Sequence, residues 1–205
     1  VNDAWAGPRS TSTLVLSFSP QDERYAFFSE GASINNTNLS TYQDGYSVVK
    51  FTNLLSTDWD NAAGRAESYP DTDFPLFRLA DVYLMYAESV ARGGEGGDMD
   101  TAVDYVNELR DRGYGDTPHN KIDAAWLKAN NYQNILNERG RELYWEGVRR
   151  MDLIRYGKFT DSSYTWPSKG GVITGVGVNE RYNIFPIPVS DISVNGSLEQ
   201  NEGYK

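Results

Sequence analysis

Residues 134–159, NILNERGRELYWEGVRRMDLIRYGKF, decide the fold of this chain. Their apolar members recur three and four positions apart, which predicts one long or twice-broken helix packed on a core. The charges follow the same spacing, with Glu146 three residues before Arg149 and Asp152 three residues before Arg155. Because solvated pairs of this kind stabilise a helix by only about 0.2–0.5 kcal/mol each, a run this dense indicates that some of them are buried.

One stripe of this predicted helix carries Glu142, Glu146 and Arg149 beside the apolar Leu153. We therefore expect Glu146 and Arg149 to form a buried pair, in which loss of one partner would cost about 3–5 kcal/mol. Gly147 falls in mid-helix, where glycine costs about 1 kcal/mol relative to alanine and usually serves a bend or a close backbone approach. A structural ion-pair helix is the favoured interpretation, and a catalytic carboxylate is the alternative.

Two amphipathic segments precede this stretch. The first is predicted over residues 73–93 with Asp73 as its N-cap, and the second over residues 98–113 with Asp98 as its N-cap. Glycine-rich residues join them, so they should form an antiparallel, TPR-like helical hairpin. A short helix is expected over residues 121–129, with its inward face formed by Ile122, Ala125, Trp126 and Ala129. In the helix predicted over residues 73–93, the apolar face expected to pack on the core consists of Leu76, Leu79, Ala80, Tyr83, Leu84, Ala87, Val90 and Ala91.

Composition excludes several classes of function. The 205 residues suit one domain or a substantial part of one, and the net charge of −10 would repel a phosphate backbone, which argues against nucleic acid as a partner. The sequence contains no run of eighteen apolar residues, so no transmembrane helix is predicted. The chain has no Cys, and its single His, His119, is expected at the surface of a loop rather than as a base. We expect no cofactor and no metal, and assign loop capping to the acidic group Asp58, Asp60, Asp71 and Asp73 because it lacks EF-hand spacing.

Three segments, in order, resemble motifs of the SusD/RagB family, surface glycan-binding lipoproteins of Bacteroidetes-type outer membranes. FPLFRLADVYLMYAESVARG, residues 74–93, is similar to the family's RLADVYLMYAEA helix. ERGRELYWEGVRRMDLIRYG, residues 138–157, resembles its ER-x-x-EL-x-x-EG-x-R-x-x-DL-x-R-x-G signature, and YNIFPIPVSDISVNGSLEQNEGY, residues 182–204, resembles its closing motif. Family members are much longer, so the resemblance covers only the C-terminal portion of one.

The resemblance implies a mainly α fold of TPR-like helical hairpins with long loop excursions and short β segments. It also implies non-enzymatic binding of an oligosaccharide, polysaccharide or other nutrient over a TonB-dependent, SusC-like transporter. The protein would be a surface-exposed outer-membrane lipoprotein whose anchor lies outside this chain. We expect one structural unit with three parts: a loop-rich ligand-binding segment (1–72), a helical core (73–157), and a loop with an extended tail (158–205).

Aromatic side chains are abundant, with 14 Tyr, 5 Trp and 8 Phe. A flat ring can stack on the C–H face of a sugar while polar neighbours meet its hydroxyls. Trp5 is the leading candidate for such a platform, with Asp3 and Arg9 as polar partners, and Tyr42 and Trp59 are further candidates. Ordinary packing is the competing interpretation for each ring. No catalytic residue is expected.

Two other classes of function stay open. A TPR-like adaptor would bind a peptide or protein and ignore sugars. A glycoside hydrolase would need two convergent carboxylates at a defined separation. With 29 acidic residues some pair is inevitable, so their number does not favour hydrolysis.

Overall fold

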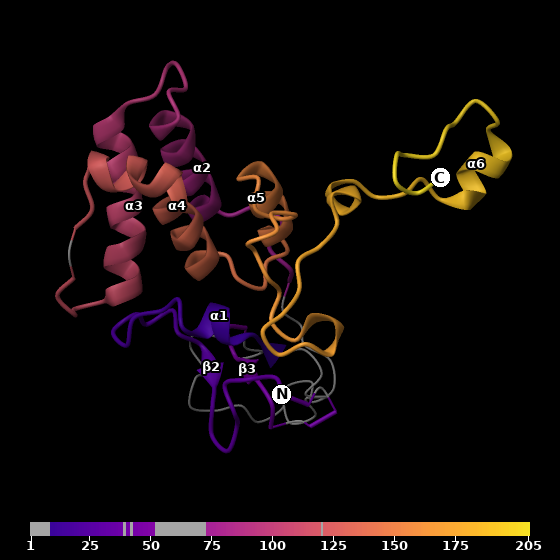
Figure 1. Ribbon diagram of the computed structural model, residues 1–205. Coiled ribbons are helices and arrows are strands. Elements are labelled where there is room, and N and C mark those ends of the chain that lie inside the picture. The colour runs from indigo at the N-terminus through magenta and orange to yellow at the C-terminus, as the bar shows by residue number, and fades with distance from the viewer. Residues whose placement is uncertain (1–8, 39, 42, 52–72, 120) are drawn as a thin grey trace. The chain divides into compact units, whose positions relative to one another are not determined.

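The computed structural model describes residues 9–38, 40–41, 43–51, 73–119 and 121–205 (Figure 1). The chain forms two compact units, Val1–Val148 and Arg149–Lys205. The predicted mainly α fold with helical hairpins and short β segments is confirmed. The finer division at residues 72 and 157 stays a prediction. The elements of the first unit are β1 (Arg9–Ser10), α1 (Ser12–Val15), β2 (Phe27–Phe28), β3 (Tyr46–Val48), α2 (Leu79–Ala91), α3 (Met99–Tyr114) and α4 (Ala124–Glu142).

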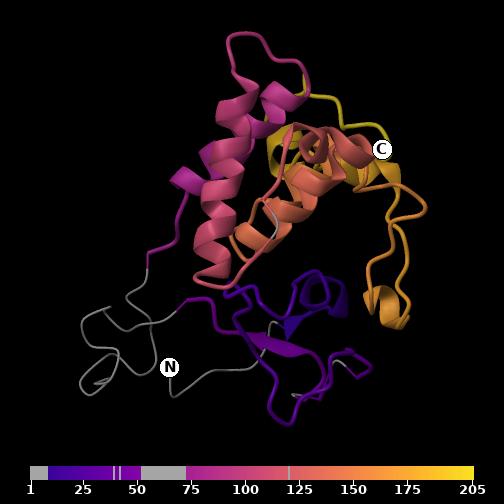
Figure 2. The same cartoon turned by 90° about the vertical axis from the view of Figure 1, so that its left-hand side faces the viewer.

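Helices α2 and α3 form the predicted hairpin, and α4 packs beside them (Figures 1 and 2). Asp98 caps α3 by accepting a hydrogen bond from the Thr101 N–H at 2.7 Å. Ala87 and Ala102 are both fully buried, so small side chains let the two helices approach closely. The core around them is made by Leu84, Ala91, Val106, Leu109, Leu127 and Ile135.

The predicted start of α2 at Asp73 is wrong, because the helix begins at Leu79. Leu76 and Leu79, which were expected to face the core, are 76% and 61% exposed. Pro75 disfavours a helical conformation in the residue before it. Arg78 is also extended, with φ −148° and ψ 156°, and its guanidinium binds carboxylates far along the chain. Within residues 76–90 no strand occurs, as expected for this hairpin.

Helix α4 is two helices joined at a kink. Asn130, Asn131 and Tyr132 all have positive φ values, and asparagine tolerates this conformation better than most residues. The predicted 121–129 helix is therefore the first part of α4, capped by Asp123, which accepts from the Trp126 N–H at 2.8 Å. Its predicted inward face was partly wrong: Leu127 is fully buried, whereas Ala125 is exposed.

The predicted helix over 134–159 is broken once, at residues 143–148. Gly147 is not in mid-helix, since its φ of +77° lies in the left-handed region that favours glycine. The break lets Tyr144 leave the helix and pack into a second core. Its ring lies 5.5 Å from that of Phe18 and stacks on Phe27 at 5.3 Å between centroids.

This second core belongs to the loop-rich segment, which carries a small antiparallel sheet in the order β1-β3-β2. Arg9 in β1 pairs with Ser47 in β3, and Phe27 in β2 pairs with Val48. The Tyr144 hydroxyl donates to the Arg24 carbonyl at 2.8 Å. The sheet and the end of α4 are therefore parts of one folded unit.

The second unit contains α5 (Arg149–Arg155), the 3₁₀ turns η1 (Lys169–Gly171) and η2 (Glu180–Asn183), and α6 (Val189–Val194). Trp166 and Val176 form an antiparallel bridge, which confirms that the glycine-rich residues 170–178 form a hairpin-like loop. At Gly175, with φ +80°, an added Cβ would lie 2.2 Å from the Trp166 carbonyl oxygen. Among the described helices, none combines the length and apolar character needed to cross a membrane.

Candidate functional site

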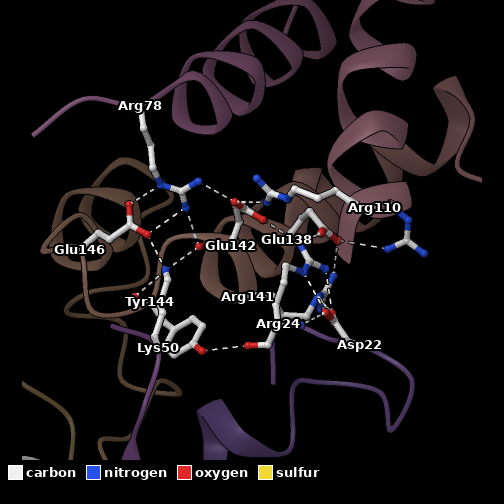
Figure 3. A network of polar contacts seen from close by, with 11 residues as sticks. Asp22, Arg24, Lys50, Arg78, Arg110, Glu138, Arg141, Glu142, Tyr144 and Glu146 are labelled. Atoms are coloured by element: carbon white, nitrogen blue, oxygen red, sulfur yellow. Dashed lines mark hydrogen bonds and ion pairs between the residues drawn. The ribbon is translucent and has the colours of Figure 1, made fainter. Parts of the chain in front are cut away.

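A network of charged side chains joins the loop-rich segment to the end of helix α4 (Figure 3). Its acids come mainly from α4 and the turn after it, and most of its cations come from other parts of the first unit. The members are Asp22, Arg24, Lys50, Arg78, Arg110, Arg112, Glu138, Arg141, Glu142 and Glu146.

Arg24 links the loop-rich segment to α4. Its side chain is 10% exposed and binds Asp22 in a two-point contact, with both N···O distances at 2.8 Å. The same guanidinium reaches Glu138 at 2.7 Å and Glu142 at 3.1 Å. The Asp22 and Glu138 side chains have no exposed surface, so these charges depend on their partners rather than on water.

Arg78 and Lys50 bind the C-terminal end of α4. Arg78 pairs with Glu142 and with Glu146, each at 2.6 Å. Lys50 pairs with Glu146 and donates to the carbonyls of Glu142 and Tyr144 at 2.8 and 3.0 Å. A helix leaves its last carbonyls without internal partners, so cations at this position satisfy both the carboxylates and the backbone.

The prediction that Glu142 and Glu146 are buried is confirmed. Lys50 and Arg78, which lie 96 and 68 residues earlier in the chain, both bind Glu146. The pairing of Glu146 with Arg149 stays a prediction. In the second unit the predicted Asp152–Arg155 pair is confirmed at 2.8 Å, with the Asp152 side chain 1% exposed.

The electrostatics of the network keep Glu138, Glu142 and Glu146 ionised. Burial alone would raise the pKa of Glu138, but attraction by Arg141 and Arg24 outweighs it and lowers the pKa to about 2. Burial likewise opposes ionisation of Glu142 and Glu146, whereas hydrogen bonds from cationic side chains lower the pKa of both. A general acid needs a pKa near the working pH, so these three carboxylates suit structural pairing rather than proton donation.

A cavity of about 390 Å³ opens beside the network. Phe51, 41% exposed, and Tyr144 contribute aromatic surface to it. Its described lining consists of Glu23, Arg24, Ala26, Lys50, Phe51, Pro75, Arg78, Arg112, Arg141, Glu142, Tyr144 and Glu146.

Only one of the five residues predicted to bind a sugar lies within the described part of the chain. Arg9, in β1, donates a hydrogen bond to the Thr41 carbonyl. It also helps to lower the pKa of Asp44, after the larger effects of hydrogen bonds from Thr37 and Asn38. The candidates outside the described residues are Asp3, Trp5, Tyr42 and Trp59.

The prediction that His119 lies at the surface is wrong. Its side chain is 10% exposed, stacks on Tyr114 at 4.6 Å between centroids, and places Nε2 3.0 Å from Asp111. Within the described residues, no group of three or more His, Asp or Glu side chains could hold a metal ion.

Sequence reasoning identified Glu142 and Glu146 but missed the other two acids, Asp22 and Glu138. It also missed the cations Arg24, Lys50, Arg78 and Arg112. One signal was present, because acids spaced four apart on a buried face need cations. Residues 134–148 hold three such acids, Glu138, Glu142 and Glu146, but only two cations, Arg139 and Arg141. The D-x-R sequence of Asp22 and Arg24 was the other local sign, because the two side chains pair with each other.

A sequence model of the SusD family matches residues 12–204. The chain belongs to the SusD family. The starch-binding protein SusD of Bacteroides thetaiotaomicron is 44% identical over 167 residues, which is 82% of this chain and 27% of that protein. The SusD-like protein P25 of Formosa agariphila is 32% identical over 139 residues, which is 63% of this chain and 24% of that protein.

Solved SusD-family structures share the fold. A SusD superfamily protein from Parabacteroides distasonis aligns with 96% of this chain and 42% of its own, with a TM-score of 0.63 and 26% identity. NanU of B. fragilis aligns over 95% of this chain and 39% of its own, with a TM-score of 0.57 and 21% identity, which concerns the fold alone. The chain thus spans less than half the length of each of these relatives.

Proposed function

We propose that this SusD-family protein binds an oligosaccharide or polysaccharide at the outer-membrane surface without altering it chemically. As a surface-exposed lipoprotein, it would deliver the glycan to a TonB-dependent, SusC-like transporter. The observation that carries the proposal is the 44% identity to a protein named for starch binding. That similarity spans 82% of the chain.

The proposed binding platform is Trp5, with Asp3 and Arg9 reaching sugar hydroxyls and with Tyr42 and Trp59 as further aromatic surfaces. The hydrogen bond from Arg9 to the Thr41 carbonyl supports this grouping. It ties the strand that follows Trp5 to the residue that precedes Tyr42 in sequence. A rigid backbone beneath the loops would favour binding, because less ordering is then needed when the ligand arrives.

The state of the network carboxylates supports binding over hydrolysis. An inverting or retaining glycosidase uses one carboxyl group with a raised pKa as its general acid. Glu138, Glu142 and Glu146 instead have lowered pKa values and bind cations. A TPR-like adaptor function is the other alternative to test.

A glycan array probed with the intact protein, read beside a turnover assay on each bound glycan, tests the proposal. We expect binding without turnover, and copurification with a TonB-dependent transporter from outer membranes. Turnover that disappears on neutralising one carboxylate would establish a hydrolase instead. Binding of peptides with no sugar bound would establish an adaptor.

Replacing Trp5 tests the site itself. Stacked aromatic contacts are worth about 0.5–1.5 kcal/mol beyond area burial, so Trp5→Ala should weaken glycan binding at least several-fold with the fold unchanged. Trp145→Ala is the matched control, since Trp145 is 40% exposed and lies outside the proposed platform. Equal affinity of the Trp5 variant and the unaltered protein would remove Trp5 from the site.

A further inference from the structure

The lining of the cavity beside the ion-pair network has a net charge opposite in sign to that of the whole chain. Among its described lining residues five are cationic, namely Arg24, Lys50, Arg78, Arg112 and Arg141, and three are acidic, namely Glu23, Glu142 and Glu146. The lining therefore carries a formal charge of +2. With Asp22, Glu138 and Arg110, which pair with it from behind, the cluster carries +1, whereas the whole chain carries −10. Such a reversal favours an anionic group inside the cavity.

We propose that this cavity binds the carboxylate of an acidic sugar, with Arg112 as its main donor and Phe51 as its stacking surface. The proposal rests on the glycan-binding function proposed above and narrows it to a class of ligand. The carboxylate supplies a negative charge that offsets the cationic lining. The sugar ring supplies an apolar face on which an aromatic side chain can stack.

Arg112 differs from the other cations of the cavity in how many donors the protein already uses. Lys50 spends its three donors on two carbonyls and Glu146. Arg78 makes four hydrogen bonds to Glu142 and Glu146. Arg112 makes one within the described structure, from Nη2 to Glu142, and its side chain is 55% exposed.

A guanidinium has five N–H donors in a planar fork that matches a carboxylate at two points. Arg112 therefore retains enough donors for a second carboxylate while it stays bound to Glu142. Glu142 and Glu146 do not repel such a ligand strongly, because Arg78 and Lys50 already compensate them. Glu23 is the remaining acid of the lining.

The size and the walls of the cavity suit one sugar ring. Its volume of about 390 Å³ lies within the range of about 300–1,000 Å³ common for small-molecule sites. The exposed ring of Phe51 can stack on the C–H face of a pyranose. Lys50 fixes this wall, since its ammonium lies 5.7 Å from the Phe51 centroid and 4.5 Å from that of Tyr144.

Calorimetry on the intact protein tests this inference with four probes: glucuronate, galacturonate, glucose and acetate. We expect at least one uronate to bind at least tenfold more tightly than glucose or acetate, and more weakly as salt is raised because exposed charges are screened. Arg112→Gln should weaken uronate binding at least tenfold, and Phe51→Ala at least several-fold. Lys128→Gln, the same charge change at an exposed site on α4, should leave it unchanged.

Each contrary outcome has a distinct meaning. Uronates that bind no better than glucose, in a protein that still binds neutral glycans, would overturn this inference and leave the proposed function standing. Acetate that binds as tightly as the uronates would overturn the assignment to a sugar. Unchanged uronate affinity in Arg112→Gln, with an unchanged Tm, would remove the carboxylate from this cavity. No binding of any glycan, neutral or acidic, would overturn both proposals.

Discussion

Replacing Arg24 with methionine tests whether the buried network holds the loop-rich segment on the helices. Methionine keeps an unbranched apolar side chain but removes every charge-assisted hydrogen bond. Arg24 is 10% exposed and binds Asp22 and Glu138, whose side chains have no exposed surface, as well as Glu142. The variant would therefore leave three carboxylates without the cation that they share.

The size of the effect follows from which partners remain. Removing one partner of a buried pair costs about 3–5 kcal/mol, because the remaining charge stays desolvated. Glu138 keeps Arg141 at 2.6 Å and Arg110 at 3.2 Å. We therefore expect the free energy of unfolding to fall by about 3 kcal/mol, the lower end of that range. In a domain of about 200 residues this lowers Tm by about 6–12 °C.

Urea unfolding followed by circular dichroism measures this loss, and Arg112→Gln is its matched control. Arg112 pairs with Glu142 as Arg24 does, but its side chain is 55% exposed. Exposed pairs contribute about 0.2–1 kcal/mol, so the control should lose less than about 1 kcal/mol. An equally small loss for Arg24→Met would show that water replaces the guanidinium, and the argument from burial would be refuted.

Three further predictions concern acid stability, a helix cap and a loop glycine. The pKa of Glu138 is about 2 in the folded chain against an ordinary 4.5. Between these values the unfolded chain binds a proton that the folded chain does not. The free energy of unfolding should therefore be steady above about pH 5 and fall by about 3 kcal/mol towards pH 2. Glu138→Gln should be less stable at pH 7, and its free energy of unfolding should depend less on pH between about pH 5 and pH 2. Asp123→Ala should cost about 1 kcal/mol in urea unfolding by removing the cap of α4; no loss would show that the cap is dispensable. Gly175→Ala should lower the free energy of unfolding by at least about 1–2 kcal/mol, seen as a fall in Tm, because Gly175 has a positive φ and its added Cβ would meet the Trp166 carbonyl. In the control, Gly196→Ala, the added Cβ meets nothing within 4 Å, so Tm should change little.

Local signals account for the parts of the fold that the sequence predicted. The α3 cap at Asp98 and the periodic core residues of α2 and α3 are all set by neighbours within a turn or two. The start of α2 was not predictable in this way. Arg78 stays extended while binding Glu142 and Glu146, which lie 64 and 68 residues later.

The same distinction between local and distant signals applies to the candidate site. Charges on an apolar stripe predicted that Glu142 and Glu146 are buried, because that inference needs only helical spacing. Their cations could not be predicted, because Arg24 and Lys50 lie 118 and 96 residues from the carboxylates that they bind. A helical pattern therefore shows that a buried charge needs a partner, but not which residue supplies it.

The network links the order of the loop-rich segment to that of the helices. The carboxylates of α4 can be buried at low cost only when cations from the loop-rich segment reach them. In turn, Arg24 and Lys50 are fixed beside Tyr144, whose ring packs with Phe18 and Phe27 in the core under the sheet. Neither part reaches its lowest free energy without the other. A ligand that meets loops fixed in this way loses less of its binding free energy to ordering them, which is why a structural network of this kind suits a protein whose proposed task is to bind rather than to react.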